Sequence, residues 1–346
     1  MERNKNSTLF IIFKYLFSLL FALFLVWLLF RNQDPVILIN KISEADFKWV
    51  ILSMIFGGLA YFSRGLRWII LIEALGYRSS KTHSIASVSI GYFTNLFVPR
   101  AGEISRCTAL SRSEKIPVDK LFGTILIERV IDFIFLILLF LLTVLLKFEM
   151  IISFFNELSS HTAEKSSNEK YVIIFGSIFI FLIALFTFLK FIQNTKLYNK
   201  ILKFFEGLKE GFRSIRKMKR RMTFWIHTFI IWIMYFLMTY ICFYALEETS
   251  HLGISDGLFL LVLGGIGMVI PTPGGIGSYH AIVMIGLSVL GVGTIVLSGG
   301  GDPSNPALLF PTIVHTAQTL VAIILGSLSL IILFFSKRDS NNEKYR

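Results

Sequence analysis

Residues 121–146 read L-F-G-T-I-L-I-E-R-V-I-D-F-I-F-L-I-L-L-F-L-L-T-V-L-L, an apolar run with only three charged side chains. A helix needs about 20 mainly apolar residues to cross the ~30 Å hydrocarbon core of a bilayer. This run is therefore predicted to be a transmembrane helix. Its charged residues, Glu128, Arg129 and Asp132, would lie about 10–16 Å into the helix at a rise of ~1.5 Å per residue.

Further apolar runs on both sides of this segment also qualify as full spans. The first is too long for a cleavable signal peptide and lacks a small-residue cleavage site, so it is predicted to stay as an anchor. We predict six full spans: 9–30, 47–72, 121–146, 171–189, 222–246 and a long run ending at residue 335.

The composition agrees with a membrane protein. Hydrophobic residues make up 54% of the chain and charged residues 16%, with a mean hydropathy of +0.70. Soluble domains carry about 25% charged residues, so a soluble enzyme, a disordered chain and a secreted disulfide scaffold are excluded. Cys107 and Cys242 lack the spacing of a metal site or a disulfide framework. The net charge of +12 leaves nucleic acid or a membrane as the partner.

Two regions are apolar but broken by proline and glycine. Residues 84–112 are interrupted at Val98-Pro99-Arg100-Ala101-Gly102, and residues 257–298 at Pro271-Thr272-Pro273-Gly274-Gly275-Ile276-Gly277. Irregular backbone at membrane depth is tolerated only where it is buried in protein or lines a cavity. Each region is therefore predicted to be a re-entrant helical hairpin that enters and leaves on one side.

The distribution of cations predicts the orientation, because Lys and Arg accumulate on the cytoplasmic side. With the N-terminus inside, the inside segments hold 24 Lys and Arg, and the outside segments hold 5. We therefore expect both termini in the cytoplasm, a plasma (inner) membrane location and no nucleic-acid partner. The inside segments are 1–8, 73–83, 99–120, 190–222 and 337–346, and the outside segments are 31–48, 148–170, 247–256 and 299–306.

Residues 190–222 hold 11 of the 34 Lys and Arg. Apolar residues in this segment recur at steps of three and four, which gives one apolar helical face. They are Leu197, Ile201, Phe205, Leu208, Phe212 and Ile215. We predict a helix that lies on anionic lipid headgroups at the cytoplasmic surface; a soluble loop helix is the alternative.

In this orientation the order of elements repeats upside down. Residues 9–147 give a span outward, a span inward, a hairpin opening inside and a span outward; residues 171–335 give the inverted order. Inverted repeats with Gly/Pro-interrupted segments at matching positions mark secondary transporters. The prediction is thus a single all-α, polytopic transmembrane domain over residues 1–346. The repeat is one of topology, since the halves share no convincing residue identity.

Charged side chains in the first half lie where charge is costly, at about 2.5–3.5 kcal/mol each near the bilayer centre. Such residues are expected to face the protein interior, and they are functional candidates by default. Arginines converging from the inner side would bind a phosphate bidentately, while carboxylates hold and release them. The alternative is a salt-bridge network that only holds the helices together. The candidate set is Arg64, Arg67, Arg100, Glu103, Arg106, Glu128, Arg129 and Asp132.

The second half is nearly free of charge, with no Asp, Glu, Lys or Arg from residue 257 to 301. Glycines such as Gly264 and Gly267 allow close helix packing. The Pro/Gly cluster is too dense for packing alone and favours an unwound turn. The broken-helix residues are Pro99, Gly102, Pro271, Pro273, Gly274, Gly275, Gly277 and, nearby, His280.

Three motifs carry a family resemblance: Pro99-x-x-Gly102-Glu103-x-x-Arg106, Glu128-Arg129-x-x-Asp132 and Pro271-x-Pro273-Gly274-Gly275-x-Gly277. In this order they resemble the transmembrane region of lysylphosphatidylglycerol synthases, part of a broad group of flippase-like integral membrane proteins. The resemblance covers essentially the whole chain. In full-length members this region is implicated in moving lysyl-lipid between leaflets, and a cytosolic C-terminal domain makes that lipid from aminoacyl-tRNA.

Residues after the last span are few, so the resemblance implies translocation without synthesis and hence no enzyme. Members often carry a glutamate three residues after the last glycine of the Pro-Gly-Gly motif, where this chain has His280. If that glutamate takes part in ion coupling or in headgroup selection, this protein is expected to differ from those members in both properties. A lone buried histidine is otherwise more often structural, which applies also to His227 and His315.

The expected function is transbilayer movement of an anionic phospholipid or a polyprenyl-phosphate-linked lipid, with no cofactor and no metal. No Walker motif is present, so movement would be passive or driven by an ion gradient. One alternative is a membrane enzyme acting on a lipid-phosphate; another is an accessory subunit of a lipid or glycan synthase. The expected partners are lipids with anionic headgroups, with a homo-oligomer or a synthase partner left open. The acids considered for the enzyme are Glu103, Glu128, Asp132, Asp34, Glu44 and Asp46, with Ser278 and His280 as a nucleophile and base.

Overall fold

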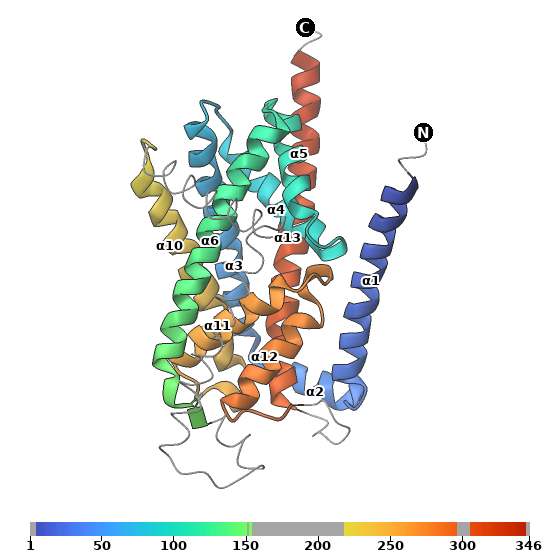
Figure 1. Cartoon of the computed structure of the whole chain (residues 1–346), viewed down its shortest axis with the longest axis vertical. Coiled ribbons are helices and arrows are strands. Elements are labelled where there is room, and N and C mark those ends of the chain that lie inside the picture. The colour runs from blue at the N-terminus through green and yellow to red at the C-terminus, as the bar shows by residue number, and fades with distance from the viewer. Residues whose placement is uncertain (1–4, 151, 154–217, 296–304, 344–346) are drawn as a thin grey trace, which may run out of the picture. The chain divides into compact units, whose positions relative to one another are not determined.

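The structure, a computed structural model, describes residues 5–150, 152–153, 218–295 and 305–343. These residues form helices and connecting turns, with no strand among them. The chain divides into one unit of Met1–Phe140 with Met222–Arg346 and a second unit of Leu141–Arg221. The fold below is that of the first unit (Figure 1). The predicted span 171–189 and most of the basic segment 190–222 lie outside the described residues.

In the described part of the chain, four helices are long and apolar enough to cross a membrane. They confirm four predicted spans: 47–72, 121–146, 222–246 and the final run. α10 (Arg221–Tyr240) continues without a gap into a short 3-10 helix, η2 (Ile241–Ala245). The other three are α3 (Phe47–Ala74), α6 (Val118–Leu146) and α13 (Pro306–Glu343).

The predicted anchor at 9–30 forms α1 (Lys5–Phe30), which is followed by the short helix α2 (Pro35–Glu44). Residues 15–30 of α1 meet α2 at a bend of 85°. These two helices are a fifth candidate span only if they are counted together as one broken span. Asp34 starts α2 because its side chain accepts a hydrogen bond from the Val36 amide at 2.8 Å. Pro35 suits the first position of a helix, where no backbone donor is needed.

The first broken region is a helix–break–helix hairpin of α4 (Lys81–Phe97) and α5 (Gly102–Glu114). The two helices pack against each other. Glycine makes the close approach possible, since a Cβ on Gly102 would lie 2.3 Å from the Gly91 carbonyl oxygen. The break is held by the Gly102 amide, which donates to Asn95 Oδ1 at 2.7 Å.

The second broken region has the same plan. α11 (Ile254–Val269) and α12 (Ser278–Val289) pack together around the turn η4 (Pro273–Gly275). Gly274, Gly275 and Gly277 have φ angles of 58°, 81° and 80°, which L-residues with a side chain rarely adopt. The unwound turn predicted from the Pro/Gly cluster is therefore present.

The two hairpins lie toward opposite ends of the unit, and their breaks meet (Figure 1). η4 contacts α4, and a Cβ on Gly274 would lie 3.2 Å from Leu96 Cδ2. Arg100 reaches across, donating from Nη2 to the Val269 carbonyl at 3.2 Å. The start of α1 and the end of α13 lie at the same end of the unit.

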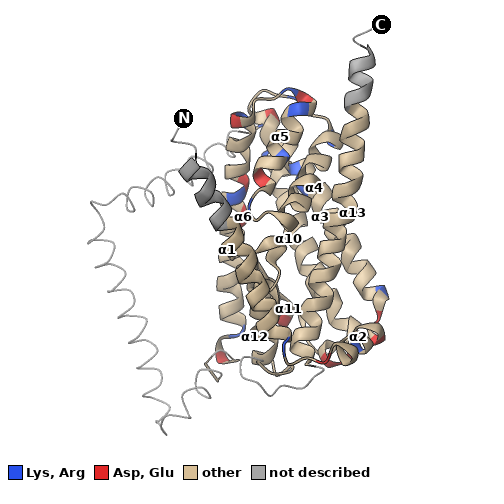
Figure 2. Ribbon diagram, turned by 90° about the vertical axis from the view of Figure 1, so that its right-hand side faces the viewer, with Lys and Arg blue, Asp and Glu red and all other residues tan. Residues whose placement is uncertain are grey.

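Apolar side chains cover the outside of the long helices. In the most apolar 18-residue stretch of α6, only 17% is buried inside the protein. In the corresponding stretch of α13, 22% is buried. Figure 2 shows long stretches of helix without charge, while charged residues gather toward the ends and near α4, α5 and α6. Since water would not favour such surfaces, the exposed faces of these helices are suited to lipid.

Candidate functional site

One face of α3 carries the first two arginines. Arg64 and Arg67 are three residues apart and are 3% and 0% exposed, so both guanidinium groups are buried. Between them, Gly65 lets α4 approach, because a Cβ there would lie 2.7 Å from the Ile85 Cα. Ser84 on α4 fixes this contact by donating to the Gly65 carbonyl at 2.9 Å. Glycine thus brings α4 against the arginine face.

One face of α6 carries the matching acids. Thr124, Glu128 and Asp132 follow at steps of four, so they lie on the same side of the helix. The Glu128 side chain is fully buried, and that of Asp132 is 12% exposed. Two carboxylates without water must find cationic partners, since an isolated buried charge is very costly.

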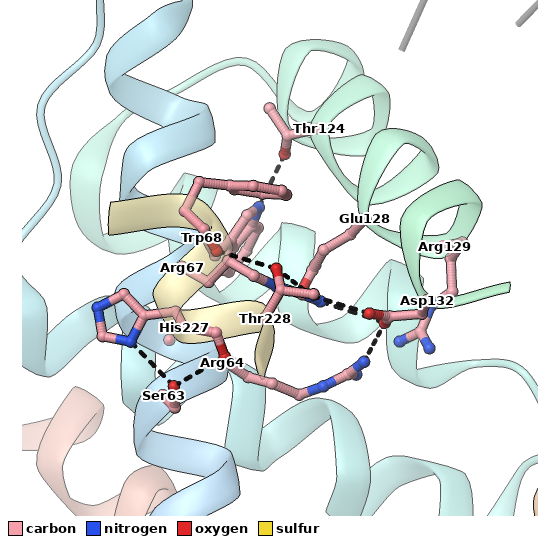
Figure 3. Close-up of polar contacts among 12 residues, drawn as sticks. Ser63, Arg64, Arg67, Trp68, Thr124, Glu128, Arg129, Asp132, His227 and Thr228 are labelled. Carbon is pink, nitrogen blue, oxygen red and sulfur yellow. Dashed lines mark hydrogen bonds and ion pairs between the residues drawn. The ribbon is translucent and has the colours of Figure 1, made fainter. Parts of the chain in front are cut away.

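Three arginines supply those partners, and Figure 3 labels two of them, Arg64 and Arg67, beside the two acids. Arg67 Nη2 donates to Glu128 Oε1 at 2.9 Å and to Asp132 Oδ2 at 3.2 Å. Arg64 Nη2 pairs with Asp132, and Arg106 Nη2 on α5 pairs with Glu128 Oε2 at 2.5 Å. We call Arg64, Arg67, Arg106, Glu128 and Asp132 the buried ion cluster. It joins α3, α5 and α6.

Aromatic and hydroxyl side chains enclose the Arg64 end of the cluster. Arg64 Nη1 donates to Tyr92 OH at 2.7 Å, and Tyr92 OH lies 2.9 Å from Tyr235 OH. Tyr61 stacks on Tyr92, with ring centroids 4.0 Å apart. These contacts add α4 and α10 to the site.

The Arg106 end is held by Trp68. Its ring lies 4.8 Å from Arg106 Cζ, within the range of a cation–π contact. Trp68 Nε1 is in turn fixed by a hydrogen bond to Thr124 Oγ1 at 2.7 Å. On the other side, Arg67 Nη1 donates to Thr228 Oγ1 of α10 at 3.3 Å. The arginines are therefore held by aromatic and hydroxyl groups as well as by carboxylates.

The cluster carries more positive than negative charge. Three guanidinium groups face two carboxylates, which leaves one positive charge in excess among the described residues. The Nε atoms of all three arginines are buried and have no hydrogen-bond partner among the residues that the structure describes. Each unsatisfied buried donor costs about 1–3 kcal/mol. The site has both the charge and the free donors to accept an anion.

Three other predicted residues make no ion pair with this cluster in the described part of the chain. Arg129 does not reach Asp132; its Nε lies 3.4 Å from Glu103 Oε1, and the two side chains are 44% and 27% exposed. Arg100 does not join the predicted convergence of arginines. It contacts the Val269 carbonyl instead, because the chain turns at Arg100 with φ of 62° before α5 begins.

Two buried histidines lie at the turn of the second broken region, His280 on α12 and His315 on α13, and among the described contacts neither joins the cluster. His315 Nε2 donates to the Gly274 carbonyl at 2.8 Å and so steadies the turn. The His280 ring centroid lies 4.9 Å from that of His315, and His280 Nδ1 is buried without a partner. Ser278 Oγ bonds to Thr272 Oγ1 at 2.7 Å and to the Gly275 carbonyl. Ser278 and His280 do not form a nucleophile–base pair.

The outer acids serve local structure. Asp34 caps α2, Glu44 pairs with Lys41 at 3.1 Å, and Asp46 pairs with Lys48 at 2.7 Å. Within the described ranges, no three His, Cys, Asp or Glu side chains are placed to hold a metal ion. Cys107 and Cys242 are buried and free.

Several residues of the site had not been predicted from the sequence, among them Trp68 and Thr124. The sequence contains a pattern that could have identified Thr124, since it precedes Glu128 by four residues on the same helix face. No local pattern identifies Tyr92, Thr228 and Tyr235, because their contacts join segments more than 25 residues apart in sequence.

The fold and site define a class: a polytopic α-helical membrane protein with two broken hairpins and a buried arginine–carboxylate cluster. The chain matches the family described as lysylphosphatidylglycerol synthase TM region over residues 15–326. It therefore belongs to that family, as the three motifs had indicated. The match is to the transmembrane region, and no catalytic domain of a synthase is detected.

Distant relatives are UPF0104 membrane proteins of archaea. The chain is 24% identical to one from Methanothermobacter thermautotrophicus over 73% of this chain and 79% of the relative. It is 25% identical to one from Pyrococcus horikoshii over 69% and 76%. A third, from Methanocaldococcus jannaschii, is 32% identical, but the match spans only 37% of this chain and 36% of that protein. No solved structure matches. The protein is thus a multi-pass membrane protein.

Proposed function

We propose that this protein moves an anionic lipid, either a phospholipid or a polyprenyl-phosphate-linked lipid, between the leaflets of the plasma membrane. The observation that carries the proposal is the buried ion cluster, in which three arginines outnumber two carboxylates. Guanidinium groups bind phosphate bidentately, so the cluster is suited to a lipid headgroup. The proposal assigns headgroup binding to the cluster first and to Arg100, Glu103 and Arg129 at its margin.

The depth of the cluster supports movement across the membrane rather than binding at its surface. Glu128 lies ten residues after the first residue of α6, and Arg64 ten residues before the last residue of α3. Both positions are therefore about 15 Å from helix ends, a depth that would lie near the middle of a ~30 Å hydrocarbon core whose surface is level with those ends. Ionisable groups at that depth mark substrate pathways.

The proposed architecture is one transmembrane domain with two inverted halves, 9–147 and 171–335. The two hairpins approach from opposite ends of the unit and meet at their breaks, as such a repeat requires. The N-terminal end of α1 and the C-terminal end of α13 lie on one side, which the cation distribution assigns to the cytoplasm. A homo-oligomer or a synthase subunit as partner belongs to the same proposal.

The membrane-enzyme alternative has less support. Its candidate acids either pair with arginines, as Glu128 and Asp132 do, or serve helix ends and surface ion pairs. A general acid or base must be free to exchange a proton with substrate. We therefore propose a transporter without catalytic residues of its own.

The proposal is tested by leaflet exchange in proteoliposomes. Purified protein is reconstituted with fluorescent phosphatidylglycerol, and dithionite quenching measures the fraction of label that reaches the outer leaflet with time. We expect Arg64→Ala, Arg106→Ala and Glu128→Ala each to slow exchange by about tenfold or more, since each breaks a buried ion pair and changes the charge of the proposed headgroup site.

Glu248→Gln is the matched control, because Glu248 is exposed and far from the cluster in sequence. Each variant is compared at equal reconstituted amount, with a thermal unfolding curve to show that it is folded. Wild-type protein that exchanges no faster than empty liposomes would refute the function. Cluster variants that exchange at the wild-type rate would refute the site.

A further inference from the structure

We propose that the buried ion cluster selects lipids whose phosphate carries a single negative charge, that is, phosphodiesters rather than phosphomonoesters or pyrophosphates. The inference rests on the proposed function and specifies its substrate class. It concerns Arg64, Arg67, Arg106, Glu128 and Asp132 alone.

The charge balance of the cluster is the first argument. Arg64, Arg67 and Arg106 face two carboxylates, so one positive charge has no counterpart among the described residues. In a water-poor site, leaving any net charge is costly. One monoanion brings the balance to zero, whereas a dianion leaves a net negative charge. The cluster is thus neutralised by one phosphodiester.

The second argument comes from the donors. The carboxylates occupy Nη atoms of the three arginines, while each Nε is buried without a partner. A phosphate oxygen pair can take one Nε–H and one Nη–H from the same guanidinium group as a fork. A phosphodiester has two unesterified oxygens and so can use one such fork without displacing both carboxylates.

The third argument is that the carboxylates are fixed. Glu128 accepts from Arg67 at 2.9 Å and from Arg106 at 2.5 Å and is fully buried. Losing it would raise the positive charge of the site by one and favour a dianion. The carboxylates therefore set the charge that the site accepts, in addition to positioning the arginines.

Selection by phosphate charge separates the lipids allowed by the proposed function into those that fit the site and those that do not. Glycerophospholipids and sugars linked to a polyprenyl chain through one phosphate are phosphodiesters and fit the site. Phosphatidate and bare polyprenyl phosphate are monoesters that carry close to two charges at neutral pH, and they do not. Polyprenyl pyrophosphates are excluded for the same reason.

The test uses soluble lipids with identical chains and the full-length protein in uncharged detergent. Isothermal titration calorimetry compares dihexanoyl phosphatidylmethanol, a diester, with dihexanoyl phosphatidic acid, a monoester, and with uncharged dihexanoylglycerol. At pH 8 we expect the diester to bind about tenfold or more tightly than the monoester. At pH 5.5 the monoester carries about one charge, so the gap should close. The diester carries one negative charge at both pH values, so a change in its affinity reports titration of groups on the protein.

A variant gives the reverse test. Asp132→Asn raises the excess charge of the cluster from one to two, so at pH 8 the preference should turn toward the monoester. Glu248→Gln makes the same chemical change at an exposed position and should leave the preference unaltered. The wild-type pH comparison decides the question alone if Asp132→Asn does not fold.

The outcomes separate this inference from the proposed function. A monoester that binds more tightly than the diester at pH 8, or equally, would overturn charge selection and leave an anionic-lipid site standing. Wild-type protein that binds neither anion better than dihexanoylglycerol would overturn both. A diester preference that persists unchanged at pH 5.5 would also overturn charge matching, because both ligands are then monoanions.

Discussion

The two broken hairpins have the same backbone plan and opposite chemistry. In each, two short helices pack closely through glycine on either side of a Pro-containing break. The α4–α5 hairpin lies against α3 and α6 and supplies Arg106 to the buried ion cluster. The α11–α12 hairpin belongs to a charge-free core with the aromatic and aliphatic residues of η2 and α13.

This difference indicates that the two hairpins contribute to function in different ways. Broken helices at membrane depth require only that their backbone be buried or line a cavity; charge is an additional and costly feature. The first hairpin buries a charged side chain, Arg106, whereas the second carries a single charged residue, Asp256 in the first turn of α11, so we infer that headgroup recognition belongs to the first. The second would then act through packing alone. Substitutions in the two hairpins and in the buried ion cluster test this contrast, and the largest effect is expected in the cluster.

Glu128→Ala should be the most damaging single change, because it leaves Arg67 and Arg106 buried without their shared acceptor. Breaking a buried ion pair costs about 3–5 kcal/mol. The measurement is the free energy of unfolding in mixed detergent, followed by tryptophan fluorescence.

Glu248→Ala is the control and should change the free energy of unfolding by less than about 0.5 kcal/mol, as exposed substitutions do. A double variant, Glu128→Gln with Arg106→Gln, should recover part of the loss, with a coupling energy of about 0.5–3 kcal/mol. Equal costs for Glu128→Ala and Glu248→Ala would show that the cluster does not hold the first half together.

Gly267→Ala should destabilise the second hairpin by overpacking. The added Cβ would lie 3.0 Å from the Tyr279 Cα and 3.1 Å from the Ser278 carbonyl oxygen, so backbone must move. Such changes cost about 1–3 kcal/mol, measured as the loss in free energy of unfolding. Gly91→Ala should cost a similar amount in the first hairpin, where the Gly102 carbonyl oxygen is 2.9 Å from the new Cβ.

Gly123→Ala on α6 is the control for both, since nothing lies within 4 Å of its Cβ position. Alanine is favoured over glycine in a helix by about 1 kcal/mol, so this variant should be stabilised. A Gly267→Ala protein as stable as Gly123→Ala would mean that the second hairpin is not held by close packing.

His315→Met should cost more than His280→Met. His315 donates to the Gly274 carbonyl at 2.8 Å, and its loss leaves that carbonyl unpaired at a cost of about 1–2 kcal/mol. His280 Nδ1 has no partner, so replacing it with an apolar side chain of similar size loses no hydrogen bond there. Thermal unfolding of the two variants measures the difference. The opposite order would assign the structural role to His280.

The sequence was sufficient for the parts of the fold that depend on local pattern. Apolar length predicted the described spans, and Pro/Gly density predicted both breaks. Steps of three and four residues placed Arg64 with Arg67 and Glu128 with Asp132 on single helix faces. Because a charged side chain that faces lipid is costly, these two helix faces must turn toward each other. The ion pairs between them show that they do.

Contacts between distant segments could not be predicted in this way. Glu103 and Arg106 are three residues apart on α5, but they do not pair with each other: Arg106 pairs with Glu128 and Glu103 with Arg129. The choice depends on how α5 docks on α6, which helical spacing does not determine. Asp34 had been considered as a catalytic acid, although Asp34-Pro35 is also a common helix start and the structure uses it as one.

The smallest effect should come from the margin of the cluster. Arg129 and Glu103 are 3.4 Å apart and partly exposed, so their ion pair is worth only about 0.2–1 kcal/mol and is weakened by salt. Arg129→Gln should lower the free energy of unfolding by that amount in 20 mM salt and by almost nothing in 500 mM salt, values chosen so that the screening length falls from roughly 20 Å to roughly 4 Å. Arg106→Gln, which removes a buried partner of Glu128, should show a large loss at both salt concentrations. If Arg129→Gln is instead as costly as Arg106→Gln and insensitive to salt, Arg129 and Glu103 belong to the buried cluster. That outcome would leave the excess charge at one, since the pair is neutral, and would enlarge the recognition site without changing the contrast between the hairpins.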